Sequence, residues 1–257
     1  MPRARSARLV TLGLLAAAAV VGFFIGAVGI GGILLIPALT TLGGLSIHEA
    51  AATALFTFLF TGIAGTWLFL RRGSIDWRIT IPVCAGALLF AYAGAWANSR
   101  IGSVALAAAI ALIIVAAGAY ILLAPPPARQ RLRDGAARGE RTTLALVGVV
   151  SGFGSGLSGA GGPLFSVPIM MVLGFVPLAA IGTSQVLQII AAVGGSIGNL
   201  QFGEINFGVA GWVTLAELAG VVLGVRLAHA ASMRVLRAMA ATLCIVVGSA
   251  MLVRTLA

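Results

Sequence analysis

Two clusters of glycines have the composition and spacing of an anion-binding backbone. The first reads Gly26-Ala-Val-Gly-Ile-Gly-Gly32, and the second reads Gly156-Leu-Ser-Gly-Ala-Gly-Gly162. Glycines let an anion approach the backbone closely, and a helix that begins after them presents unpaired N–H groups and about half a positive charge. Pro163, which follows the second cluster, is a favoured first residue of a helix. The pattern therefore predicts two helix starts that can bind an anion.

The two clusters belong to an internal repeat with an offset of 130 residues. Gly22, Gly26, Gly29, Gly31 and Gly32 recur as Gly152, Gly156, Gly159, Gly161 and Gly162. The match extends to Gly44 with Gly174, Thr53 with Thr183, and Gly73-Ser-Ile-Asp-Trp77 with Gly203-Glu-Ile-Asn-Phe207. Among membrane proteins, paired glycine breaks at matching positions of two halves indicate a substrate site.

The candidate substrate-binding residues are glycines of the two breaks, one serine within the second break, and polar residues that follow the short apolar segments. They are Gly29, Gly31, Gly32, Thr53, Ser158, Gly159, Gly161, Gly162, Thr183, Ser184, Gln185 and Gln188. The two glutamines can share a helix face and donate amide hydrogens to an anion. Two alternatives stay open: the glycines allow close helix packing, and the polar side chains form hydrogen bonds between helices.

Glu217 is the acidic residue that lies well inside an apolar run. Ionisable groups inside a membrane segment are costly, so they are candidates for function by default. We predict that Glu217 carries a coupling proton. The sequence contains no nucleophile–base pair and no set of metal ligands, so it predicts no catalytic residue, no metal and no cofactor. Cys84 and Cys244 lie in apolar runs and are interpreted as packing residues.

The composition is that of an integral membrane protein. Of the 257 residues, 60% are apolar and 9% are charged, whereas soluble domains carry roughly 25% charged residues. Successive apolar runs of about 20 residues favour a polytopic bundle of helices over a β-barrel. The net charge of +10 arises from sixteen arginines that lie mostly in the amino-terminal tail and the loops. That distribution orients a membrane protein and does not indicate binding to nucleic acid.

The chain divides into two repeats of five apolar segments. The expected divisions are a first repeat at 1–124, a polar arginine-rich linker loop at 125–141 and a second repeat at 142–257. The predicted segments are 9–28, 31–43, 50–70, 79–97 and 101–124, and then 142–158, 162–174, 178–200, 207–228 and 235–256. The second segment of each half is too short for an ordinary crossing, which predicts broken or half-length helices after the glycines.

The orientation depends on whether the short segments count as crossings. If they do not, the repeats are parallel and the cytoplasmic side carries 12 of the arginines against 4. If they do, the repeats are inverted and the ratio is 11 to 5. Because the two ratios are nearly equal, the positive-inside rule does not distinguish parallel from inverted repeats.

Several motifs together resemble the TauE/SafE sulfite exporter family, also called the 4-toluene sulfonate uptake permease family. In the first half they are Gly26-Ala-Val-Gly-Ile-Gly-Gly32 with Leu34-Leu-Ile-Pro37, His48-Glu-Ala-Ala-Ala-Thr53 and Arg71-Arg-Gly-Ser-Ile-Asp-Trp77, and in the second Ile181-Gly-Thr-Ser184 and Gly220-Val-Val-Leu-Gly-Val-Arg226. The resemblance covers nearly the whole chain. One departure is Ala52-Thr-Ala54, where the second half has Gly-Thr-Ser.

The resemblance implies a multi-pass carrier in the bacterial inner membrane that moves sulfite, sulfonates or related organosulfur anions. It also implies two inverted repeats around a central site, and so decides the orientation in favour of inversion. The expected partners are a small sulfur-containing anion and the lipid bilayer. A carrier for another small anion or sulfur metabolite, a channel, and a non-transporting scaffold or enzyme stay open, as does a homo-oligomer. The exact substrate, the direction of transport and the coupling ion are also open.

Overall fold

The computed structural model describes residues 2–98, 103–123, 138–158, 161–202 and 205–256, all of them helical apart from short connections. The first half contains α1 (Pro2–Val28), the 3-10 turn η1 (Gly32–Leu34), α2 (Leu35–Thr41), α3 (Ile47–Arg71), α4 (Trp77–Asn98) and α5 (Ser103–Leu123). The second half contains α6 (Arg138–Ser158), α7 (Pro163–Val172), α8 (Pro177–Phe202), α9 (Phe207–Ala230) and α10 (Met233–Leu256). The predicted all-helical class is confirmed.

Six helices of the described residues are long and apolar enough to cross a membrane. These spans are Thr11–Val28, Glu49–Arg71, Trp77–Gly94, Pro177–Ile197, Phe207–Ala230 and Met233–Ala250. Their outward faces carry large apolar side chains, including Leu89 at 75% exposure and Trp212 at 69%. Such faces are stable against lipid, so the chain is a multi-pass membrane protein.

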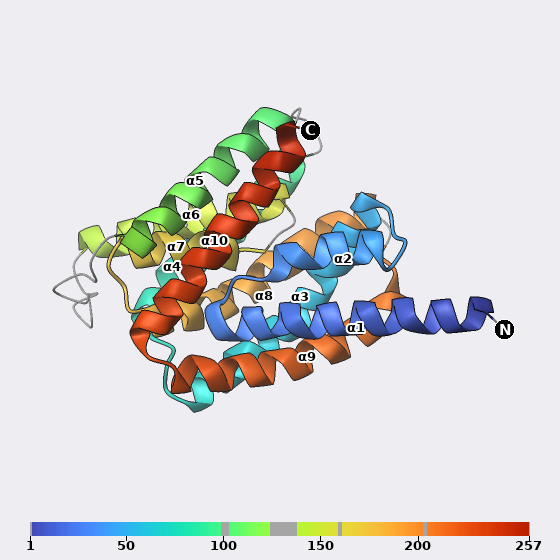
Figure 1. The fold of residues 1–257 in the computed structure, drawn as a ribbon. Helices are drawn as coiled ribbons and strands as arrows, with labels where there is room; N and C mark the ends of the chain where they lie inside the picture. The colour runs from blue at the N-terminus through green and yellow to red at the C-terminus, as the bar shows by residue number, and fades with distance from the viewer. Residues whose placement is uncertain (1, 99–102, 124–137, 159–160, 203–204, 257) are drawn as a thin grey trace.

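Both glycine clusters break a helix, as the sequence predicts. After the first break, α2 has 7 residues, and after the second, α7 has 10. At 1.5 Å per residue these helices reach only about 10 and 15 Å, which is half a bilayer or less. Gly13 of α1 faces the side chain of Leu42 just beyond α2, so α2 runs back along α1 (Figure 1).

The two halves are interleaved in space. Helix α1 of the first half packs along α9 of the second, and α6 packs along α4 in the equivalent way. Helix α3 also packs on α9, just as α8 packs on α4. The equivalent helices α3 and α8 pack on each other, and so do α5 and α10. The main helix contacts of one half are therefore repeated by the other, which is the pattern of a two-fold relation.

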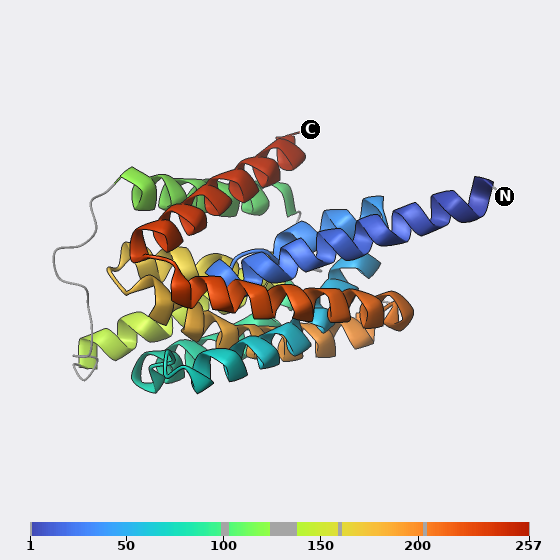
Figure 2. The same ribbon diagram turned by 60° about the horizontal axis from the view of Figure 1, so that its bottom comes forward.

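The direction of each pair follows from its closest contacts. Along α3 and α8, Gly195 meets Leu55 while Gly65 meets Gln185, so these two helices are antiparallel. Helices α5 and α10 are antiparallel too, because Arg237 at the start of α10 donates to the carbonyl of Ile121 at the end of α5 (3.0 Å). Figures 1 and 2 both show α5 and α10 side by side.

The earlier glycines of the repeat serve helix packing. Gly22 and Gly26 of α1 lie against the backbone of α9, where Gly220 and Gly224 lie against α1 in return. A β-carbon at any of these four positions would meet a backbone atom of the other helix. This is the small-residue packing expected between membrane helices, and the alternative interpretation of the glycines is correct for this part of the cluster.

A substitution on α9 tests this packing. Gly220→Ala is expected to lower the unfolding temperature in detergent, because its methyl group would meet the carbonyl of Ala19 and overpacking costs about 1–3 kcal/mol. Gly211→Ala is the matched control on the same helix, since nothing lies within 4 Å of its β-carbon position. Equal unfolding temperatures for the two variants would contradict this account of the α1–α9 contact.

Candidate functional site

The first break is buried between α1, α7 and α8. Gly29 ends α1 with φ of 75°, in the left-handed region that favours glycine, and its N–H donates to the carbonyl of Ile25 (3.0 Å). A β-carbon on Gly29 would lie 2.6 Å from Ser184 Oγ and 3.0 Å from Val167 Cγ2. The break therefore brings a glycine backbone against the hydroxyl of one candidate residue, Ser184, from the opposite half of the chain.

The second break lies against α3 and α8. Gly161 has φ of 84°, and Gly162 is the N-cap of α7, with Pro163 in the first turn. The β-carbon position of Gly161 is 3.7 Å from the ring of Phe58, and that of Gly162 is 3.0 Å from Leu187. Of the other candidates here, Gly159 and the side chain of Ser158 lie outside the described residues.

The two breaks share an unusual set of backbone donors. Gly31, Gly32, Gly161 and Gly162 are all buried, and in the described part of the chain their N–H groups donate no hydrogen bond. Their carbonyls do accept within the new helical turns, for example from Leu34 N at 2.9 Å. Buried N–H groups without a partner are rare, because each costs about 1–3 kcal/mol. A ligand with several acceptor oxygens would remove that cost.

The hydroxyls of α8 point to neighbours on several helices. Thr183 Oγ1 and Thr80 Oγ1 of α4 are hydrogen-bonded at 3.0 Å. Ser184 donates to the carbonyl of Ile181 in its own helix at 2.7 Å, which leaves its acceptor lone pairs beside Gly29. The equivalent of Thr183 in the first half, Thr53, accepts from Asn206 N at 3.1 Å. All three candidate hydroxyls are buried.

The two candidate glutamines hold helices together in this structure. Gln185 Nε2 donates to the carbonyl of Ile25 (2.8 Å), and Gln188 Nε2 donates to the carbonyl of Phe58 (3.1 Å) and to Thr61 Oγ1 (2.8 Å). The interhelical bonding that was the alternative interpretation is therefore present. Gln185 Oε1 is buried with no hydrogen-bond partner, so this side chain is only partly satisfied.

The contact between Gln188 and Phe58 marks the centre of the molecule. These residues are equivalents of one another, 130 positions apart in the repeat. In a two-fold arrangement, an element meets its own equivalent only at the axis. Because Gly161 lies beside Phe58 and Gly162 beside Leu187, the second break adjoins this axis. The candidate residues on α3, α7 and α8 therefore gather around the middle of the protein.

Three buried serines lie near the second break but are not in the list of candidate substrate-binding residues. Ser151 and Ser155 on α6 and Ser166 on α7 are fully buried, and none has a hydrogen-bond partner for its hydroxyl. Their equivalents in the first half are the apolar residues Val21, Ile25 and Ile36. The signal was present in the sequence, since Ser151 and Ser155 are one turn apart and precede the second break.

Glu217 lies near the middle of α9, about 15 Å along the helix from Phe207. Its side chain is fully buried, and neither carboxyl oxygen has a hydrogen-bond partner. Thr57 of α3 lies beside the carboxyl group, but its hydroxyl donates to the carbonyl of Ala54 (2.9 Å). The backbone of Glu217 packs against Gly22 of α1. The predicted coupling residue is thus an unpaired acid at the junction of three helices.

Together, these features define a multi-pass helical membrane protein built from two interleaved repeats, each with a broken helix next to the central crossing of α3 and α8. The family described as Sulfite exporter TauE/SafE matches residues 14–251, and the chain belongs to this family. The predicted resemblance is confirmed.

Relatives of the chain carry transporter names. It is 26% identical to the probable membrane transporter protein YdhB of Bacillus subtilis, over 80% of this chain and 85% of the relative. It is 30% identical to the probable membrane transporter protein YunE of the same organism, over 77% of this chain and 80% of the relative. A probable membrane transporter protein of Methanocaldococcus jannaschii is 26% identical over 91% and 93% of the two chains. No solved structure matches.

Proposed function

We propose that the protein is a secondary carrier that moves sulfite, sulfonates such as sulfoacetate, or related small organosulfur anions across a bacterial inner membrane. It works by alternating access, and a proton gradient drives it. The anion binds between the two glycine breaks. The observation that carries the proposal is a set of four buried glycine N–H groups at equivalent positions of the two halves, which donate no hydrogen bond within the part of the chain that the structure describes.

The chemistry of the breaks suits a sulfur oxyanion. Such an anion offers several oxygens, as phosphate does, and helix starts bind phosphate through backbone N–H groups. The described spans place no arginine next to the breaks, so the donors would be neutral N–H groups and hydroxyls such as that of Ser155. Neutral donors bind an anion moderately and release it, which a carrier requires.

The two halves are proposed to be inverted repeats across the bilayer. Support comes from the antiparallel packing of the equivalent helices α3 and α8, and of α5 and α10. A two-fold axis that reverses equivalent helices lies in the membrane plane, as in other carriers with inverted repeats. In this arrangement the α3–α4 loop, the linker and the arginines from Arg226 to Arg237 face the cytoplasm. That side then has eleven of the sixteen arginines.

Counterflow in liposomes tests the proposal. Purified protein is reconstituted with unlabelled sulfite, sulfoacetate or taurine inside, and uptake of trace labelled substrate is followed. A carrier is expected to show transient accumulation of label above equilibrium with at least one of the anions. A channel would show equilibration alone. Absence of accumulation with every sulfur oxyanion, in protein shown to be folded, would contradict the proposed substrate class.

A further inference from the structure

Equivalent residues of the two halves adopt different contacts at the two ends of the molecule. Asp76 precedes α4 and its equivalent Asn206 precedes α9. Ala179 lies near the start of α8, and its equivalent Glu49 lies near the start of α3. In a two-fold molecule, each end therefore brings together one pair of these residues: Asp76 with Ala179, and Asn206 with Glu49.

At the Asn206 end, the pair is in contact. Asn206 Nδ2 donates to Glu49 Oε1 (3.1 Å), and Asn206 N donates to Thr53 Oγ1 (3.1 Å). These bonds fasten the start of α9 to the first turns of α3. Phe207 adds an edge-on ring contact with Phe56, with centroids 5.3 Å apart. Among the described residues, these contacts hold the start of α9 against α3.

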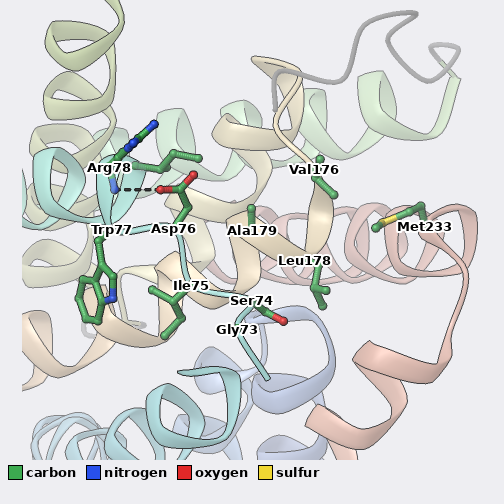
Figure 3. A pocket seen from close by; sticks show the side chains of 11 residues that line it. Gly73, Ser74, Ile75, Asp76, Trp77, Arg78, Val176, Leu178, Ala179 and Met233 are labelled. Atoms are coloured by element: carbon green, nitrogen blue, oxygen red, sulfur yellow. Dashed lines mark hydrogen bonds between the residues drawn. The ribbon is translucent and has the colours of Figure 1, made fainter. Parts of the chain in front are cut away.

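At the Asp76 end, the equivalent residues line a cavity of about 630 Å³. Figure 3 shows Asp76 and Ala179 on facing elements, with Arg78 extending away from both. Asp76 Oδ1 accepts from Arg78 N at 2.9 Å, within its own loop, while Ala179 has no group that could bind it. The wall is completed by Val176 and Met233.

A buried pair of hydroxyls lies between the level of this cavity and that of the first break. Thr80 and Thr183 each lie one turn deeper than Asp76 and Ala179, and their hydroxyls are joined at 3.0 Å. The next residue of α8 is Ser184, whose hydroxyl lies against Gly29. The buried Thr80–Thr183 pair thus lies one turn inward of the cavity residues Asp76 and Ala179, next to the residue that contacts the first break.

We propose that Asn206 and Glu49 form a gate that is closed in this structure, and that Asp76 and Ala179 occupy the equivalent gate in its open state. The inference rests on the proposed function, because it assigns the structure to the carrier state that is accessible from the arginine-rich face. In the opposite state, the Asn206–Glu49 bond opens and the start of α4, at Asp76, approaches Ala179. The Thr80–Thr183 pair is the thin inner barrier on the open side.

The proposed gates also predict which of the two states is favoured. The closed gate gains a hydrogen bond to a carboxylate, which is among the stronger kinds, whereas closing the other gate would bring Asp76 to an alanine. The two halves have similar shapes but unequal gates, so the equilibrium between the two states is biased by the Glu49 and Asn206 side chains.

Exchanging the gate residues tests the inference. Two reporters are made separately: Leu178→Cys in the cavity wall and Ile205→Cys beside Asn206. Each is labelled in membranes with a soluble thiol reagent, and the unsubstituted chain is the blank, since Cys84 and Cys244 are buried. The double variant Glu49→Ala with Asn206→Asp gives the Asn206–Glu49 gate the same residue types as the Asp76–Ala179 gate. The aspartate retains an oxygen that can accept from Val209 N, as Asn206 does, so α9 keeps its cap.

The double variant is expected to speed labelling of the Ile205→Cys thiol about tenfold and to slow that of the Leu178→Cys thiol, because one charged hydrogen bond biases the states by about that factor. The reciprocal exchange, Asp76→Asn with Ala179→Glu, is expected to slow labelling of the Leu178→Cys thiol. Leu112→Ala, on the exposed face of α5, is the control. Unchanged labelling rates in both folded double variants would overturn the inference.

Labelling needs no substrate, so the result is independent of which anion is carried. Rates that shift as expected in a protein without sulfonate counterflow would retain the gates and reject the proposed substrate. Counterflow without any shift in labelling would retain the carrier and reject these gates.

Discussion

Glu217→Gln is expected to abolish uptake driven by a pH gradient. Glutamine has nearly the same volume as glutamate but cannot release a proton, so coupling is lost while packing against α1 and α3 is kept. Binding of the substrate anion to detergent-solubilised protein is expected to persist within about threefold, because the carboxyl group lies one helix away from both breaks. The measurement compares driven uptake and equilibrium binding in the same preparation.

Two further variants separate coupling from structure. Glu217→Asp keeps the acid and is expected to retain part of the driven uptake. Thr57→Val removes the hydroxyl beside the carboxyl group and changes no acid. If the pH gradient drives uptake through the Glu217→Gln variant as fast as through the parent protein, Glu217 is a packing residue and another residue carries the coupling proton.

Gly29→Ala is expected to weaken sulfite or sulfonate binding by more than about tenfold. The methyl group would fall 2.6 Å from Ser184 Oγ, and the residue would keep a φ that alanine adopts at a cost, so the approach to the N–H groups is filled and the turn is displaced. Gly161→Ala shares the backbone cost but has more room, with its nearest neighbour at 3.6 Å. It is expected to weaken binding less.

Gly44→Ala is the matched control for backbone strain. Gly44 has φ of 68°, close to that of Gly29, but no atom lies within 4 Å of its β-carbon position. The two variants should therefore lose similar stability from strain, and only Gly29→Ala should lose affinity. Binding is measured with sulfite, sulfoacetate and an uncharged sulfone of similar size. Equal affinities for the parent protein, Gly29→Ala and Gly44→Ala would eliminate the first break as the anion site.

Much of the fold is predictable because the membrane restricts the choices. Every apolar segment became a helix, since lipid leaves the backbone no alternative to internal hydrogen bonding. The bounds lie within four residues of those expected, except that α1 begins at Pro2 and not at residue 9. The glycine breaks were also visible, because a run from residue 9 to residue 43 is too long for one crossing. The repeat showed which positions are equivalent, and these proved to make equivalent contacts, such as Gly65 with Gln185 and Gly195 with Leu55.

The sequence could not separate the glycines by role. Gly26 and Gly29 are one turn apart, yet Gly26 packs against α9 while Gly29 shapes the break, and only the position of α9 distinguishes them. The partners of polar side chains were equally hidden. Gln185 and Ile25 are 160 residues apart, and Glu49 and Asn206 are 157 residues apart. Nothing in the sequence around Glu49 indicates its partner, because that partner belongs to the other half.

The central claim is that two halves running in opposite directions across the bilayer bring their glycine breaks to one site. Arg78 and Gly208 test it most directly, since they are equivalent, exposed, and each second in its helix. Arg78→Cys and Gly208→Cys are made separately and treated with a membrane-impermeant thiol reagent in intact cells and in inverted vesicles. The account predicts that the Gly208→Cys thiol reacts from the outside and the Arg78→Cys thiol from the cytoplasmic side. Reaction of both thiols from the same side would contradict it.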